Sequence, residues 1–233
     1  MRTRRVPFIV LLIAVVTAAV LALPVAAQQP PPDRFAEQVA KLVADDVAHP
    51  AAEGSILFIG SSIFRLWSTV AHDMAPLPVY NRAFGGSQTP DMLRHFDDLV
   101  VPHKPRIIVY YCGSNDVNAG QSTDAIASRI HEFASKVGTA LPGTRMIFVS
   151  INRSPDKEQR WDVVDAVNAR VRDSFTKEFA YLSYIDVNPA LFDDRGKARV
   201  ELYLPDLLHF KPPAYVAFTG IIKPLLTKAW ASR

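Results

Sequence analysis

Five short apolar runs recur along this chain with helical patterns between them, and this alternation limits the folds that the chain can adopt. Each run is apolar at nearly every position, which is typical of a strand buried on both faces of a sheet. Parallel strands need long crossover connections, and helices provide them. The alternation predicts a three-layer α/β/α sandwich, in which helices cover both faces of a five-stranded parallel sheet. The predicted strands lie at 55–59, 79–80, 106–112, 146–151 and 179–186.

Residues that start or stop helices mark the segments between these strands. Asp33 is a suitable N-cap for a helix with apolar residues at helical spacing. A later helix with one apolar face is expected to end at Gly138. Ser154 followed by Pro155 predicts the start of another helix, and Pro212 predicts the start of the last one.

The first 27 residues differ in composition from the rest of the chain. Three arginines among the first five residues precede an apolar stretch over 8–23, and then come Pro24 and the small residues Val25, Ala26 and Ala27. This order predicts a secretory signal peptide over 1–27 that is cleaved after Ala27. The alternative is an uncleaved membrane anchor, because the apolar stretch is only slightly shorter than a bilayer-spanning helix.

Charge supports this division of the chain. The whole chain has 26 basic and 23 acidic residues, a net charge of +3, and the three arginines of the signal account for that surplus. The neutral remainder predicts no nucleic-acid partner, and a membrane contact only through an uncleaved signal. We expect a linker over 28–32, one domain over 33–233, and a periplasmic or secreted location. The single cysteine, Cys112, lies in an apolar run and is expected in the core.

Glycine and polar residues follow the first three predicted strands, and an Asp-x-x-His pair precedes the last helix. The carboxyl ends of parallel strands are where ligands bind in such sheets. Four of the ten glycines lie in these loops, where glycine lets the backbone turn sharply. The segments are Gly60-Ser61-Ser62, Gly85-Gly86-Ser87, Gly113-Ser114-Asn115-Asp116 and Asp206-Leu207-Leu208-His209.

These residue types match the needs of ester hydrolysis. A serine such as Ser62 becomes a nucleophile when a base takes its proton, and His209 suits that role because histidine has a reference pKa of about 6.5. Asp206 could hold the other ring nitrogen. The N–H groups of Ser62 and Gly86 and the amide of Asn115 could bind the oxyanion of the tetrahedral intermediate.

Each signal also has a plain structural explanation. A Ser-Ser pair after a strand is commonly a helix cap, and Gly-x-Asn-Asp can be a turn that bonds to its own backbone. The Asp-x-x-His spacing occurs again at Asp46 and His49, where we expect His49 to be a helix-end residue. The prediction of a site therefore depends on four motifs occurring in order, each at a strand end or before the last helix.

Together these motifs resemble the SGNH hydrolase superfamily, the GDSL-type esterases and lipases, over about residues 56–215. The family's nucleophile is the serine of a Gly-Asp-Ser motif, and it falls on Ser62. Ser61 occupies the position of the aspartate in that motif. That aspartate is not a catalytic residue, and a Gly-Ser-Ser start with a nearby Trp67 is similar to one branch of the family.

The remaining family motifs fall on Gly86, Asn115, Asp206 and His209. The resemblance implies a flavodoxin-like sheet, hydrolysis of acyl esters without a metal or cofactor, and an open site. No Gly-x-Ser-x-Gly elbow, dinucleotide or phosphate-loop motif, or Cys-x2-Cys pair occurs in the sequence.

We therefore expect an exported serine esterase that acts on carboxylic esters, with short-chain or acetyl groups, of a small molecule or a glycan. The alternatives are an acyltransferase on cell-envelope glycans and a non-catalytic carbohydrate-binding domain that keeps the fold. The position of Trp67, Phe84, Tyr203 and the Asn152-Arg153 loop in the sequence places them near the rim of the site, although packing explains them equally well.

Overall fold

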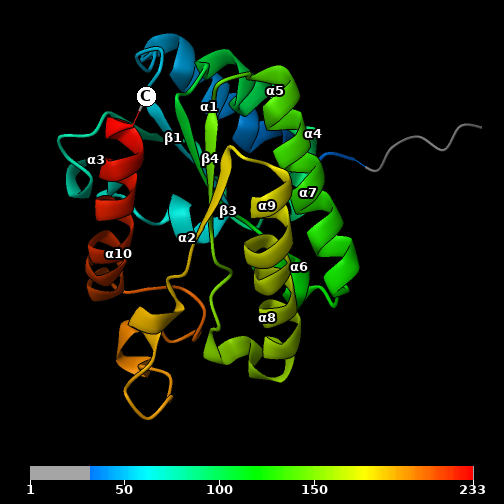
Figure 1. Ribbon diagram of the computed structural model, residues 1–233, viewed down its shortest axis with the longest axis vertical. Helices are drawn as coiled ribbons and strands as arrows, with labels where there is room; N and C mark the ends of the chain where they lie inside the picture. Colours follow the sequence, from blue (N-terminus) through cyan, green and yellow to red (C-terminus); the bar gives the residue numbers. More distant parts are fainter. Residues whose placement is uncertain (1–31, 233) are drawn as a thin grey trace, which may run out of the picture. The chain divides into compact units, whose positions relative to one another are not determined.

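Five parallel strands form one sheet in the computed structural model, which describes residues 32–232 (Figure 1). All five predicted runs form strands: β1 (Ile56–Gly60), β2 (Val79–Asn81), β3 (Ile107–Tyr111), β4 (Arg145–Val149) and β5 (Leu182–Ile185). Their order across the sheet is β2-β1-β3-β4-β5, and every pair is parallel. The three-layer α/β/α prediction is confirmed. The predicted signal peptide and all but the last residue of the predicted linker lie outside the described residues.

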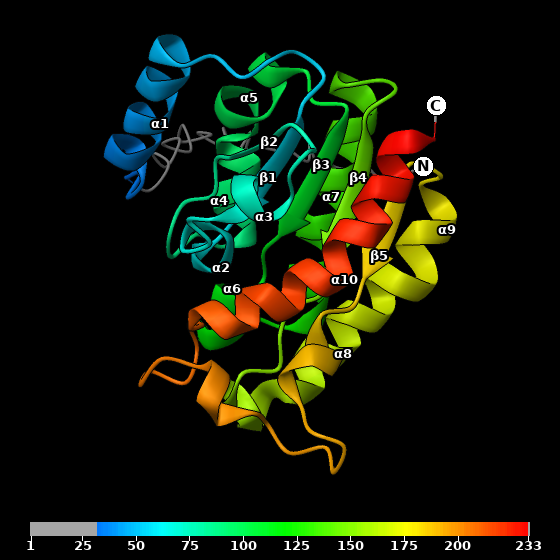
Figure 2. The same cartoon turned by 90° about the vertical axis from the view of Figure 1, so that its left-hand side faces the viewer.

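Helices cover both faces of the sheet because the strand side chains alternate between two apolar clusters (Figure 2). On one face, Leu57 and Tyr110 pack with helices α1, α4, α5, α7 and α8. On the other face, Phe58 and Val109 pack with α2, α3 and α10. Every residue of β1 and β3 is buried, which explains why their sequences are apolar throughout. Cys112 is also buried, as expected.

The helices differ in length because several short ones occupy the strand-to-helix turns. Among the described residues, no helix combines the length and the apolar character needed to cross a membrane. The α-helices are α1 (Ala36–Ala48), α2 (Ser62–Arg65), α3 (Val70–Asp73), α4 (Thr89–Arg94), α5 (Phe96–Leu99), α6 (Ser114–Asn118), α7 (Thr123–Ala140), α8 (Trp161–Arg170), α9 (Thr176–Glu178) and α10 (Pro212–Ala231). The short 3₁₀ and π segments are η1 (Val101–His103), η2 (Pro155–Arg160), η3 (Val171–Phe175), η4 (Asn188–Leu191) and η5 (Val200–Leu202).

Three predicted helix boundaries differ from the structure. The first helix has Phe35 at its N-cap position without a side-chain cap, so the prediction for Asp33 is wrong. Helix α7 continues past Gly138, where a Cβ atom would lie 2.3 Å from the hydroxyl of Tyr181. That glycine makes room for a neighbouring side chain and does not stop the helix. After Ser154 the chain first forms the 3₁₀ segment η2, and α8 begins only at residue 161.

Two glycines allow the sharp turns that end β1 and β3. Gly60 has a φ of 145° and Gly113 a φ of 119°, values that side chains rarely permit. A Cβ atom on Gly60 would lie 1.8 Å from the carbonyl oxygen of Tyr111 in the neighbouring strand. These turns start α2 and α6 directly after the strands, so Ser62 and Asn115 both lie at the carboxyl edge of the sheet.

Candidate active site

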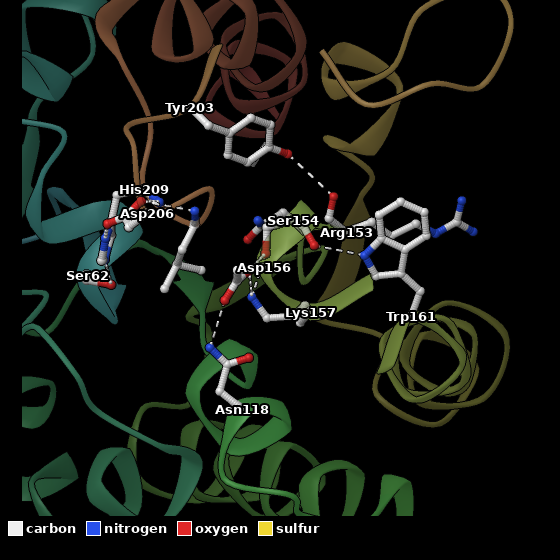
Figure 3. Close-up of polar contacts among 12 residues, drawn as sticks. Ser62, Asn118, Arg153, Ser154, Asp156, Lys157, Trp161, Tyr203, Asp206 and His209 are labelled. Atoms are coloured by element: carbon white, nitrogen blue, oxygen red, sulfur yellow. Dashed lines mark hydrogen bonds and ion pairs between the residues drawn. The ribbon is translucent and has the colours of Figure 1, made fainter. Parts of the chain in front are cut away.

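Ser62, His209 and Asp206 form a continuous line of hydrogen bonds at the carboxyl edge of the sheet (Figure 3). Ser62 is the first residue of α2, and His209 lies in the loop before α10. The Oγ atom of Ser62 is 2.9 Å from Nε2 of His209. The Nδ1 atom of the same ring is 2.6 Å from Oδ2 of Asp206. The fold therefore brings together three predicted residues, two of which are separated by 147 positions.

The carboxylate of Asp206 accepts more than the bond from the imidazole. Its Oδ1 atom accepts the backbone N–H groups of Leu208 at 3.0 Å and His209 at 2.9 Å. Burial alone would raise the pKa of Asp206, but these three hydrogen bonds outweigh it and lower the pKa to about 2. Asp206 is thus a carboxylate at neutral pH and holds the orientation of the imidazole.

The loop that carries this pair is closed by backbone contacts at its base. Tyr203 and Phe210 form an isolated antiparallel bridge, and the N–H of Leu204 donates to the carbonyl of His209 at 2.7 Å. Within the loop, Leu207 has a φ of 56°, a left-handed conformation that is uncommon for leucine. The closed base and the tight turn set the geometry between Asp206 and His209.

Three N–H donors lie beside Ser62. Its own backbone N–H is at the first position of a helix, where it has no partner within the helix. Among the hydrogen bonds of the described residues, none is donated by the backbone N–H of Gly86, which has a φ of 79°. The Nδ2 atom of Asn115 donates to the carbonyl of Ser87 at 2.9 Å, which ties the third donor to the loop that contains Gly86.

Asp116 holds these two loops together. Its fully buried carboxylate accepts the backbone N–H of Thr89 at 3.1 Å and the Thr89 hydroxyl at 2.6 Å. Burial raises the pKa of Asp116, although the bonds from Thr89 and the charge of Arg129 oppose that shift. Since Asp116 follows Asn115 in α6, the contact links α6 to the segment that begins α4.

A pocket of about 270 Å³ surrounds the Ser62 hydroxyl. Two of its residues, Gln38 and Arg65, are absent from the sequence prediction. Arg65 follows Ser62 by three residues in a helix, a spacing that places both on one face, so the sequence held a signal for it. The pocket is lined by Gln38, Ser62, Arg65, Gly85, Gly86, Asn115 and His209.

Of the residues expected near the rim of the site, three belong to the core instead. Trp67 and Tyr203 are about 1% exposed, and Phe84 is fully buried. The indole of Trp67 stacks on Tyr215, and its Nε1 donates to Asp73 at 2.7 Å. Packing therefore explains these aromatic residues. His49 follows α1 and contacts Asp45 at 3.0 Å, as expected for a helix-end residue.

The loop after β4 forms a second polar cluster next to the loop that contains His209 (Figure 3). Lys157 is buried, and its Nζ donates to Ser154 at 2.5 Å and to Asp156 at 3.0 Å. Burial lowers the pKa of Lys157, and the charge of Asp156 opposes the shift. Asp156 also accepts from Asn118 of α6 at 3.0 Å and donates its N–H to the carbonyl of Leu207 at 3.4 Å. This cluster connects α6 to the loop that contains Asp206 and His209.

The described part of the chain contains no group of three or more His, Cys, Asp or Glu side chains placed to hold a metal ion. Asp206 and His209 face each other and Ser62, which leaves them arranged for proton transfer at a hydroxyl. A hydroxyl, an imidazole and a carboxylate in line, with N–H donors beside the hydroxyl, form the arrangement of a serine hydrolase.

The class defined by this fold and site is thus that of hydrolases with a serine at the carboxyl edge of a parallel sheet. The chain belongs to the GDSL-like Lipase/Acylhydrolase family, whose family model matches residues 58–217. It is a serine hydrolase that acts on ester bonds. No curated protein sequence matches the chain.

Solved structures share this fold. A protein from Streptococcus pneumoniae superposes with a TM-score of 0.71 at 20% identity, over 82% of this chain and 92% of that one. A GDSL-like lipase from Bacteroides thetaiotaomicron gives a TM-score of 0.69 at 18% identity, over 82% and 98%. An acetylxylan esterase from Geobacillus stearothermophilus gives 0.60 at 15% identity, over 78% and 96%. At these identities the likeness concerns the fold.

Proposed function

We propose that this protein is an exported esterase that hydrolyses short-chain acyl esters, acetyl esters among them, with Ser62 as its nucleophile. The observation that carries the proposal is the line from the Ser62 hydroxyl through His209 to Asp206, with distances of 2.9 and 2.6 Å. Both distances are within hydrogen-bond range, so the imidazole can take the serine proton without a rearrangement of the loop.

The reaction proceeds in two steps. Oγ of Ser62 attacks the ester carbonyl as Nε2 of His209 takes its proton, and the imidazolium then protonates the leaving alcohol. The serine now carries the acyl group. Water attacks this acyl-enzyme with His209 as base, which releases the acid and restores the serine. Asp206 keeps the Nδ1–H tautomer and stabilises the imidazolium, while the N–H donors of Ser62, Gly86 and Asn115 hold the oxyanion.

The lining of the pocket supports a short acyl group. A long acyl chain needs apolar surface to leave water. The described residues that line the pocket of about 270 Å³ are glycine, polar or charged, and none is an aliphatic residue, a phenylalanine, a tyrosine or a tryptophan. A small acyl group fits such a site, whereas a fatty acyl chain would remain in contact with water.

Export is supported by the composition of the first 27 residues, which have three arginines, no carboxylate and a long apolar stretch. Fractionation of cells that express the full chain tests this part of the proposal. The expected result is a mature form that begins at residue 28 in the periplasm or the medium. Retention of the full-length chain in the cytoplasm would contradict it.

A panel of para-nitrophenyl esters from acetate to palmitate tests the reaction. We expect kcat/KM to be highest for acetate or propionate and to fall as the chain lengthens. Ser62→Ala is expected to lower kcat/KM at least 10³-fold, since the residual rate then depends on substrate binding and the oxyanion donors alone.

Ser61→Ala is the matched control, because it makes the same chemical change one residue earlier. The Ser61 side chain is buried and its Oγ has no hydrogen-bond partner among the described residues, so its loss is expected to leave both the fold and the activity nearly unchanged. If Ser62→Ala keeps the activity of the wild type, as Ser61→Ala is expected to do, the assignment of the nucleophile is refuted. A preference for palmitate would refute the proposed acyl length.

A further inference from the structure

The pocket around Ser62 contains one cation whose charge no carboxylate of the described residues balances. Arg65 is exposed and lines this pocket together with Ser62 and His209. Within the described part of the chain, its guanidinium has no ion pair and no hydrogen bond to a side chain. A guanidinium is always charged and offers five donors in a plane, so an unpaired one in a reaction pocket is ready for an anion.

Other arginines near the carboxyl edge of the sheet are paired. Arg34 donates to the carbonyl of Gly86 at 3.3 Å and forms an ion pair with Asp91 at 3.1 Å. Arg153, in the loop after β4, is paired with Asp165 at 2.6 Å. The unpaired state of Arg65 is therefore a local property of the Ser62 pocket.

A glycine makes room for the Arg65 side chain. A Cβ atom on Gly85 would lie 2.4 Å from Nε of Arg65 and 3.1 Å from its Cζ. The φ of Gly85 lies outside the left-handed region, so its backbone conformation would accept other residues. A larger residue at position 85 would instead occupy the space that the guanidinium of Arg65 takes. Gly85 thus lets Arg65 lie against the loop that supplies the Gly86 donor.

We propose that Arg65 selects substrates whose ester lies next to an anionic group, such as a carboxylate, a sulfate or a phosphate. This inference rests on the proposed esterase function and names the substrate class for it. When the ester carbonyl is at Ser62, the guanidinium binds the neighbouring anion through charge-assisted hydrogen bonds. The anion can belong to the alcohol part or to the acyl part of the ester.

Two matched substrate pairs distinguish these sources. Para-acetoxybenzoate carries a negative charge on the alcohol part that its methyl ester lacks. Para-nitrophenyl hydrogen adipate carries a negative charge on the acyl part that its methyl ester lacks. The quantity measured for each pair is the ratio of kcat/KM for the anionic substrate to kcat/KM for the neutral one.

We expect this ratio to fall about two- to fivefold in Arg65→Gln for at least one pair, the size typical of an ion pair at an exposed site. Arg65→Lys keeps the charge and is expected to retain part of the ratio. Gly85→Ala pushes the guanidinium aside while Arg65 is still present, so the ratio is expected to fall there as well. Between about 20 and 500 mM salt the ratio should decrease in the wild type and stay level in Arg65→Gln.

Arg195→Gln provides the matched control. Arg195 is also exposed and without an ion pair among the described residues, but it lies in the turn at 193–197 and outside the Ser62 pocket. Its ratio should equal that of the wild type. An equal ratio in wild type and Arg65→Gln for both pairs would overturn the inference while ester hydrolysis stands. If the wild type hydrolyses none of these esters, both the proposed function and the inference fail.

Discussion

The contact between Gly60 and β3 allows a quantitative prediction about the turn that presents Ser62. In Gly60→Ala, the added Cβ would lie 1.8 Å from the carbonyl oxygen and 2.7 Å from the carbonyl carbon of Tyr111. Ordinary contacts of this kind are about 3.4 Å or longer. The overlap involves two backbones, so no side-chain rotation can relieve it.

Two terms give the size of the effect. A φ of 145° is strained for alanine and costs about 1–3 kcal/mol. Separating the strands weakens the bond from the Ser61 N–H to the Tyr111 carbonyl, now 3.0 Å, and leaving that buried acceptor unpaired costs about 1–3 kcal/mol. Together they lower the free energy of unfolding by about 2–6 kcal/mol, a large share of the 5–15 kcal/mol typical of a domain.

Urea denaturation followed by circular dichroism measures this loss. The control is Gly143→Ala, because Gly143 has a φ of 92° and no atom lies within 4 Å of the position that an added Cβ would take. It isolates backbone strain, which costs about 1–2 kcal/mol. If Gly60→Ala is no less stable than Gly143→Ala, the close approach of β1 and β3 is not what requires glycine there.

Three further changes test the site. Asn115→Ala should lower kcat by about 10²–10³-fold, and it should lower the free energy of unfolding by about 1–3 kcal/mol because the carbonyl of Ser87 loses its bond from this amide. An unchanged kcat would exclude this amide as an oxyanion donor. Asp206 has its pKa lowered to about 2, so the stability from its bonds is present above about pH 4 and is lost as the pH falls through 2. Because its side chain is 47% exposed, that stability is about 1 kcal/mol or less, and the difference in free energy of unfolding between wild type and Asp206→Asn should shrink from pH 5 to pH 2. Lys157→Met should lower the free energy of unfolding by about 2–4 kcal/mol, since it leaves the Asp156 carboxylate without its cation. Thermal unfolding measures this loss, and a smaller loss would contradict the prediction.

The sequence predicts the strands well because burial on both faces leaves an unambiguous pattern. Residues 56–60 and 107–111 are buried throughout, so nothing polar interrupts their apolar runs. The residues near Ser62 are also predictable, since strand ends in a parallel sheet meet at one edge. The order of the motifs identifies Asp206 and His209, although the same spacing at Asp46 and His49 leads only to a helix end.

What the sequence cannot predict depends on contacts between distant segments. Gly138 resembles a helix stop, but the reason for this glycine is the hydroxyl of Tyr181, which follows it by more than forty residues. Trp67 resembles a rim residue until its stacking on Tyr215 is known. The role of Gly85 likewise becomes visible only when the Arg65 side chain is seen beside it.

The closed loop before α10 has a consequence for how this site can vary between relatives and in engineered forms. The bridge between Tyr203 and Phe210 seals a short segment that carries both Asp206 and His209. The geometry between Asp206 and His209 is therefore set within one continuous stretch of chain. The contact with Ser62 depends on how that stretch packs against the sheet. A graft of residues 203–210 would therefore transfer Asp206 and His209 together with their relative geometry. Substitutions elsewhere in the pocket can change the choice of substrate and leave the distance between these two side chains unaltered.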